Sequence, residues 1–72
     1  MKKPIIFVNI EAERGRKGMS RTEFSEQLGI DTDTYKRYLT GESSIPSAKL
    51  ILMAKMFKCS TDYLLGLDNF ED

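Results

Sequence analysis

The sequence predicts an all-α fold of five short helices, and three observations support this prediction. Breaking residues interrupt the 72-residue chain at short intervals, namely Gly15, Gly18, Gly29, Gly41, Pro46 and Gly66. Between these breaks the apolar residues recur with the spacing of a helix and do not alternate as they would in a strand. Residues that cap helices, such as serine and aspartate, stand before several of the segments.

The first predicted helix covers about Ile6 to Lys17, where Ile6 and Ile10 lie four residues apart on one face. Gly15 weakens the end of this helix. The apolar run from Ile5 to Val8 is longer than a helix start requires, so we expect it to extend the core or to contact a second chain.

The second predicted helix has the clearest start. Its capping box, Ser20-Arg21-Thr22-Glu23, lets the Ser20 hydroxyl accept the amide of Glu23 while the Glu23 side chain reaches back. Phe24 and Leu28 then share one face, and Gly29 provides a left-handed stop.

The third predicted helix follows after a very short turn. Asp31 is a natural N-cap, the body runs from Thr32 to Leu39, and Gly41 lies just past the end. The buried stripe of this helix is predicted to consist of Tyr35, Tyr38 and Leu39.

Two more helices complete the prediction. Ser47 is expected to cap a helix from Ala48 to Phe57, and Ser60 to cap a short helix from Thr61 to Leu65 that ends at Gly66. The apolar residues expected to face inward in the longer helix are Leu50, Ile51, Met53, Ala54 and Phe57.

Composition excludes several classes of function. The chain has no histidine and one cysteine, which excludes a disulfide framework, a Cys/His zinc site and a Cys/His or Ser/His catalytic pair within one chain. We therefore expect no catalytic residue, no metal site and no cofactor. The sequence also lacks an apolar stretch of membrane-spanning length and a signal-peptide core, so a cytoplasmic protein without a membrane partner is expected.

The charges balance overall but are unevenly distributed. Eleven basic and eleven acidic residues give a net charge of zero, which by itself argues weakly against a nucleic-acid partner. Residues 1–21 hold six basic and two acidic residues, whereas residues 60–72 hold four acidic residues and no basic one. A positive face built from the first two helices is therefore compatible with the neutral total.

Several motifs occur in a fixed order, and together they suggest a family. They are Ile10-x3-Arg14-x3-Gly18-Met19-Ser20, then Glu23 to Ile30, then Thr34-Tyr35-x-Arg37-Tyr38-x2-Gly41, then Ile45-Pro46-Ser47, and finally Ser60-x2-Tyr63-Leu64-Leu65-Gly66. In order and spacing they resemble the Cro and phage-repressor (Xre-like) helix-turn-helix family of DNA-binding proteins. The resemblance covers roughly residues 6–66.

This resemblance implies a lambda-repressor-like DNA-binding domain in which the second and third helices form the helix-turn-helix. We expect a single domain over residues 1–72, with a helical core at about 6–66, a short N-terminal arm and an acidic C-terminal tail. The family further implies a homodimer that binds a double-stranded DNA operator and regulates transcription, most simply as a small repressor in a bacterium, a phage or a mobile element. The dimer surface is expected to use the last two helices and the flanking termini, and no small-molecule effector is expected.

Candidate DNA-reading residues lie on the outward positions of the third predicted helix. Arg37 is suited to bidentate pairing with guanine, and Lys36 to donation to guanine or a phosphate. Thr32 can hydrogen-bond to a base or touch a thymine methyl, and Asp33 can accept from the cytosine amino group. These four residues are the predicted base-reading set.

Candidate phosphate contacts lie at two places flanking that helix. Ser20 and Arg21 occupy the start of the second helix, where the family places a backbone clamp. The loop residues Ser43 and Ser44 match a second phosphate-contact region of the family, although relatives often have basic residues there.

Two departures from the family pattern leave an alternative open. Leu39 stands where the family commonly has a glutamate that pairs with the arginine matching Arg14, so Arg14 requires a carbonyl, a water molecule or DNA as its partner. The negative charges of Asp31 and Asp33 make the electrostatic potential around the third helix less positive. A protein-interaction module of the same fold with weak or no DNA affinity is therefore the second hypothesis, and salt-dependent DNA binding distinguishes the two.

Overall fold

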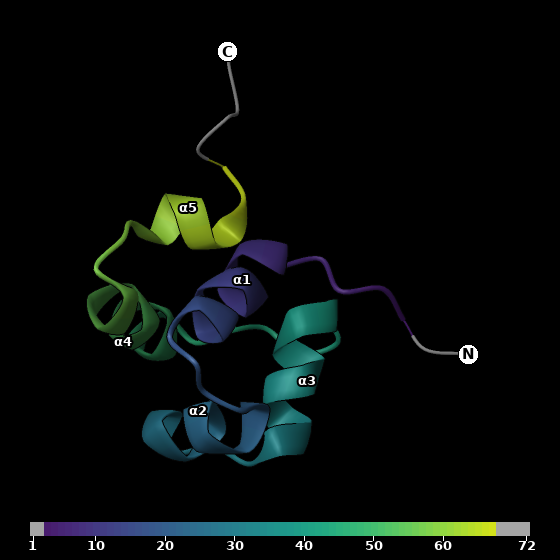
Figure 1. Cartoon of the computed structure of the whole chain (residues 1–72). Helices are drawn as coiled ribbons and strands as arrows, with labels where there is room; N and C mark the ends of the chain where they lie inside the picture. The colour runs from purple at the N-terminus through teal and green to yellow at the C-terminus, as the bar shows by residue number, and fades with distance from the viewer. Residues whose placement is uncertain (1–2, 68–72) are drawn as a thin grey trace.

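The computed structural model describes residues 3–67, and this part of the chain folds into five helices (Figure 1). They are α1 (Val8–Arg16), α2 (Arg21–Leu28), α3 (Thr32–Thr40), α4 (Ser47–Phe57) and α5 (Thr61–Leu65). Residues 3–67 contain no strand, so the predicted all-α fold is confirmed. Residues 68–72, which make up most of the expected acidic tail, lie outside the described residues.

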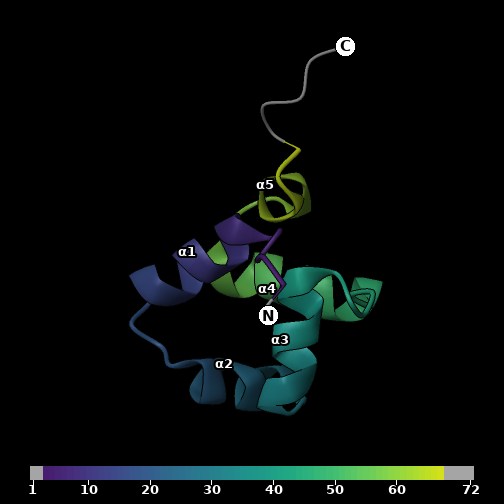
Figure 2. The same cartoon turned by 90° about the vertical axis from the view of Figure 1, so that its right-hand side faces the viewer.

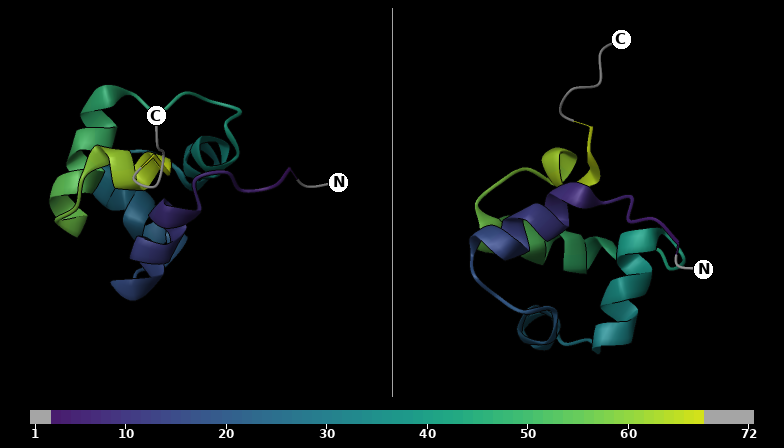
Figure 3. Two further views of the ribbon diagram at one scale, coloured as in Figure 1. Left: turned by 90° about the horizontal axis from the view of Figure 1, so that it is seen from above. Right: turned by 45° about the vertical axis from the view of Figure 1, so that its right-hand side comes forward.

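The five helices place α2 and α3 at one end of the molecule and α5 at the other. Helix α1 packs against both α5 and α3, while α4 packs against α2 and α5. Figures 1 and 2 show α2 at the end opposite α5, with the first turn of α3 beside it. The further views in Figure 3 show the same arrangement. The pair α2 and α3 therefore forms a corner that α1 and α4 support from behind.

The core is centred on Phe24 of α2. Its ring meets Tyr35 of α3 edge-on, with centroids 5.3 Å apart, and stacks on Phe57 of α4 at 5.2 Å. Aromatic pairs in these geometries contribute about 0.5–1.5 kcal/mol each beyond the burial of their area. The buried apolar residues come from all five helices: Ile10, Phe24, Leu28, Tyr35, Tyr38, Leu39, Met53, Phe57 and Leu64. The predicted core stripe of the third helix is thus confirmed.

Helix boundaries predicted from local capping residues are confirmed at three places. The capping box of α2 is complete, since Ser20 Oγ accepts the Glu23 amide at 3.0 Å and the Glu23 carboxylate accepts the Ser20 amide at 2.8 Å. Asp31 caps α3 by accepting the Thr34 amide at 2.8 Å. Ser60 caps α5 in the same way.

The predicted start of the first helix is wrong by two residues. Helix α1 begins at Val8, because the amides of Ile6 and Phe7 donate to the Leu39 carbonyl at the end of α3, at 2.8 and 3.3 Å. The N-terminal arm therefore crosses the end of α3. Gly41 makes room for this crossing: its φ is +82°, and a Cβ there would lie 2.9 Å from Cδ1 of Ile6.

Two predictions about the fourth helix are also wrong. Ser47 is the first helical residue rather than the cap, since Pro46 holds the N-cap position and its carbonyl accepts the Lys49 and Leu50 amides at 3.0 Å. The fixed φ of proline favours such a helix start. Ile51 does not face inward but is 49% exposed.

The helical period explains the exposure of Ile51. Met53 and Phe57 form the buried face of α4, and a residue two positions before Met53 lies on the opposite side of the helix. None of the helices between residues 3 and 67 has the length and apolar character that crossing a membrane requires.

Candidate nucleic-acid interface

The turn between α2 and α3 fixes the angle at which α3 leaves the core. Gly29 adopts the left-handed conformation with φ of +76°, and the Ile30 amide donates to the Ser25 carbonyl at 3.0 Å. From behind, Lys49 of α4 donates its Nζ to the Leu28 carbonyl at the end of α2. Three residues therefore suffice to join the two helices.

The two faces of α3 differ sharply in exposure. Tyr35 and Tyr38 are buried, whereas Lys36 and Arg37, directly between them, are exposed. Asp33 is also exposed, and Thr32 is half-buried at the first position of the helix. All four predicted base-reading residues thus lie outside the core on one short helix. Their contact with bases stays a prediction.

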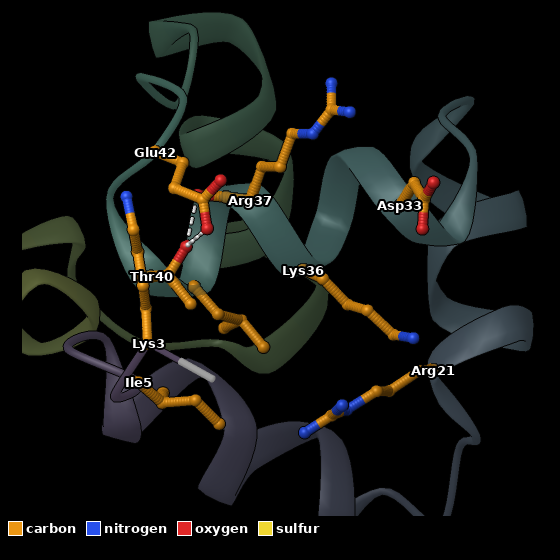
Figure 4. Close-up of a pocket in the computed structure, with 9 residues that line it drawn as sticks. Lys3, Ile5, Arg21, Asp33, Lys36, Arg37, Thr40 and Glu42 are labelled. Atoms are coloured by element: carbon orange, nitrogen blue, oxygen red, sulfur yellow. Dashed lines mark hydrogen bonds between the residues drawn. The ribbon is translucent and has the colours of Figure 1, made fainter. Parts of the chain in front are cut away.

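A shallow groove of about 660 Å³ runs along α3. Figure 4 shows Lys36 of α3 extending toward Arg21 of α2, whose guanidinium points toward α1, whereas Arg37 points away from both. The charged residues that line the groove are Lys3, Arg21, Lys36, Arg37, Asp33 and Glu42. Four of these are basic and two are acidic, so this surface has an excess of positive charge that the neutral total of the chain conceals.

The predicted phosphate-contacting residues lie at the start of α2 and in the loop after α3. Arg21 lines the groove, with 38% of its side chain exposed, and Ser20 precedes it at the exposed N-cap of α2. In the loop after α3, Ser44 is exposed and Ser43 is half-buried, with its amide donating to the Arg37 carbonyl at 3.2 Å. Phosphate contact by these residues also stays a prediction.

A residue behind this surface, Glu11 of α1, was not predicted from the sequence to contribute to it. One oxygen of its carboxylate, Oε1, accepts the Arg14 Nε and the Tyr35 hydroxyl, each at 2.7 Å. The other oxygen, Oε2, accepts Nη2 and Nε of Arg21 at 2.7 and 3.0 Å. A single side chain that is 15% exposed therefore joins α1, the first residue of α2 and the middle of α3.

The protonation states of this cluster follow from its hydrogen bonds. Burial disfavours the charged form of Glu11, but the hydrogen bonds from Arg14, Tyr35 and Arg21 outweigh it and lower the pKa of the carboxyl from 4.5 to about 2. Burial, together with the hydrogen bond to Glu11, raises the pKa of the Tyr35 phenol. At neutral pH the carboxylate is therefore charged and the phenol is protonated.

The cluster also resolves the partner of Arg14. Its Nη1 donates to the Met19 carbonyl, one of the three kinds of partner expected, whereas its Nε is paired with the Glu11 carboxylate, a partner that was not expected. The sequence did contain a signal for this pair, because glutamate and arginine three residues apart on a helix are neighbours. The contact with Tyr35, at a separation of 24 residues, has no such local signal.

A second carboxylate on α1, Glu13, faces the opposite end of the molecule. It accepts the Tyr63 hydroxyl of α5 at 3.0 Å and the Arg16 Nη1 at 2.9 Å. The hydrogen bond to Glu13 raises the pKa of the Tyr63 phenol. Close by, Asn9 donates its Nδ2 to the Tyr63 carbonyl at 2.7 Å, so two side chains of α1 secure α5.

Two helices joined by a three-residue turn, the second with a polar outward face, define a helix-turn-helix domain. The chain belongs to the Xre/Cro-like helix-turn-helix family, which matches residues 10–64, and the resemblance seen in the sequence is thereby confirmed. Proteins of this family are DNA-binding transcription regulators and are typically not enzymes, so membership supports DNA binding and transcription regulation as the general role.

The chain is similar to a curated relative, the "Uncharacterized HTH-type transcriptional regulator YobD" of Bacillus subtilis (strain 168). The two sequences are 30% identical over 54 residues, which make up 75% of the chain and 48% of the relative. The chain thus spans about half the length of this relative. No solved structure matches the chain.

Proposed function

We propose that the chain is a sequence-specific DNA-binding transcriptional regulator, acting as a small repressor, that reads the major groove with α3. The observation that carries this proposal is the exposure of Lys36 and Arg37 on a helix whose opposite face is buried in the core. Both are long donors suited to base edges, with Arg37 matched to guanine. Thr32 and Asp33 complete the base-reading set near the start of the helix.

Contacts to the DNA backbone would orient α3 in the groove. Arg21 and the amides at the start of α2 are suited to one phosphate, since a helix N-terminus and a guanidinium both attract anions. Ser43 and Ser44, in the loop after α3, are suited to a second phosphate. The excess of basic residues along the groove supports this assignment.

The proposed functional unit is a homodimer on an operator with two-fold symmetry. Two copies of α3 would lie about 34 Å apart, one turn of the double helix. The proposed contact surface consists of exposed apolar side chains at the start of α1 and directly after α5. Val8 and Leu67 are 59% and 48% exposed, which leaves apolar surface that a second copy of the chain would cover. A regulator of bacterial, phage or mobile-element DNA would act in the cytoplasm.

The experiment that tests this proposal is the selection of bound sequences from a random duplex library, followed by substitution. We expect an enriched inverted repeat. Replacing Arg37 with alanine should then cost about 1–3 kcal/mol of binding free energy and relax the preference at one base position.

Arg21→Ala should instead weaken the binding of all duplexes alike and reduce the salt dependence by about one phosphate contact. Lys55→Ala is the matched control, because Lys55 is an exposed basic residue on α4 that does not line the groove. Equal losses for Arg37→Ala and Arg21→Ala on every duplex would contradict base reading by α3.

The second candidate function is a protein-interaction module of the same fold. The acidic residues Asp33 and Glu42 in the groove favour it, and so does the pairing of Arg21 with Glu11. This function predicts weak or no duplex binding, and the absence of binding even at low salt would favour it. A regulator with several phosphate contacts loses affinity steeply as salt rises, which separates the two functions in one titration.

A further inference from the structure

We infer that Glu11 is a positioning residue of the DNA interface: it orients Arg21 toward a backbone phosphate and ties that contact to the base-reading face of α3. This inference rests on the proposed function and deepens it. Glu11 itself would touch no DNA. It would act through the two side chains that it holds, one on each helix of the helix-turn-helix.

The geometry of Arg21 leaves one side of its guanidinium available. Nε and Nη2 both bond to the same oxygen of Glu11, at 3.0 and 2.7 Å. These bonds use one edge of the planar group, and no residue between 3 and 67 accepts a hydrogen bond from Nη1. Since the side chain is 38% exposed and lines the groove, the free edge is suited to a phosphate while Glu11 still holds the other edge.

The Glu11 carboxylate also holds the base-reading helix α3. The Tyr35 hydroxyl donates to Glu11 at 2.7 Å, and Tyr35 is fully buried immediately before Lys36 and Arg37 in the sequence. One carboxylate therefore fixes the phosphate-contacting start of α2 relative to the base-reading turn of α3. Holding these groups in place before binding lowers the conformational cost of forming the complex.

A competing role for Glu11 would be to neutralise Arg21 and so oppose DNA binding. The composition of the cluster argues against it, because Arg14 is paired with the same carboxylate. Two guanidinium groups against one carboxylate leave the cluster with a net positive charge. Glu11 thus orients Arg21 without making its surroundings negative.

The test compares Glu11→Gln with Glu13→Gln in the full chain. Both substitutions remove one negative charge from α1, but the carboxylate of Glu13 bonds to Arg16 and Tyr63, away from the groove. The affinities for the selected operator and for an unrelated duplex are measured at several salt concentrations. Glu13→Gln should bind the unrelated duplex at least as well as the parent chain, since it gains one positive charge. In Glu11→Gln the same gain is offset by the loss of an oriented phosphate contact at Arg21.

The ratio of operator affinity to unrelated-duplex affinity is the decisive quantity. Glu11→Gln should lower this ratio about tenfold, the size expected when hydrogen bonds to a charged group are lost, whereas Glu13→Gln should leave it unchanged. Equal ratios for the two variants, or a higher operator affinity for Glu11→Gln, would overturn the inference.

A milder pair of variants keeps the test decisive if Glu11→Gln does not fold. Tyr35→Phe removes only the hydroxyl that bonds to Glu11 and leaves every charge in place. It should lower the ratio about threefold with an unchanged salt dependence, while Tyr63→Phe, the matched loss at Glu13, should not change the ratio. If the two tyrosine variants behave alike, Glu11 has no positioning role.

The failure of this inference is distinct from the failure of the proposed function. A parent chain that prefers the selected operator, with Glu11 and Glu13 variants of equal ratio, contradicts only the role of Glu11. A parent chain that binds no duplex at low salt contradicts the proposed function, and the role of Glu11 with it.

Discussion

Two carboxylates on α1, separated by a single residue, perform different structural tasks. Glu11 bonds to two arginines and a buried tyrosine on the side where α2 and α3 form the groove, whereas Glu13 bonds to one arginine and one tyrosine beside α5. Residues two apart on a helix lie on nearly opposite faces, which is why the same residue type serves both ends of the molecule.

The exposure of the partners determines how much each carboxylate contributes. Arg14 and Arg21, the partners of Glu11, are 20% and 38% exposed, whereas Arg16, the partner of Glu13, is 69% exposed. Exposed ion pairs contribute little because water screens them. The cluster that faces the groove is therefore expected to be the more important of the two for stability as well as for binding.

The largest expected difference is in the free energy of unfolding. Glu11→Gln should destabilise the fold by about 2–3 kcal/mol, because two arginines lose their charged partner in a largely buried cluster. Glu13→Gln should cost about 1 kcal/mol or less. Urea unfolding followed by circular dichroism measures both. Equal losses would remove the energetic distinction between the two clusters.

Acid should weaken the Glu11 cluster in a defined pH range. The folded-state pKa of about 2 lies below the value of 4.5 for an unperturbed glutamate, so its contribution is complete above pH 4.5 and is lost as the pH falls toward 2. The shift corresponds to roughly 3 kcal/mol, which partial solvent exposure reduces to about 1–2 kcal/mol.

The measurement for this prediction is the difference in unfolding free energy between the parent chain and Glu11→Gln as a function of pH. The difference should shrink steadily from pH 4.5 toward pH 2. A difference that does not change over this range would show that the Glu11 carboxyl has an ordinary pKa in the folded protein.

The smallest expected difference comes from the two tyrosine hydroxyls. Tyr35→Phe should cost about 1–1.5 kcal/mol, because a buried carboxylate oxygen loses a donor. Tyr63→Phe should cost clearly less than Tyr35→Phe, since Tyr63 is only partly buried and water can replace its hydroxyl. Thermal unfolding of both variants ranks the two contacts, and the reverse order would contradict the comparison.

Features determined by neighbouring residues were predicted correctly from the sequence. The caps formed by Ser20, Asp31 and Ser60 depend on an amide three positions away, and the buried tyrosines of α3 follow from the helical period. The N-cap of α4 at Pro46 was not predicted, although the preference of proline for the start of a helix is also a local signal.

Features that depend on distant contacts were not predicted. The N-terminal arm extends to Phe7, and α1 begins only at Val8, because the amides of Ile6 and Phe7 donate to the Leu39 carbonyl. Leu39 lies more than thirty positions further along the chain. The Glu11 cluster likewise needs Arg21 and Tyr35, and their approach follows only from the packing of three helices. The outward position of Lys36 and Arg37 was predictable, since their neighbours are core residues.

The most direct test of the central claim is to map the amide chemical-shift changes of the isotope-labelled chain as the selected operator duplex is added. If α3 reads the DNA, the largest changes occur at Thr32, Lys36 and Arg37, with smaller changes at Arg21 and little change at Tyr63. The largest changes around Tyr63, or no changes at all, would contradict the assignment of the α2 and α3 face to DNA.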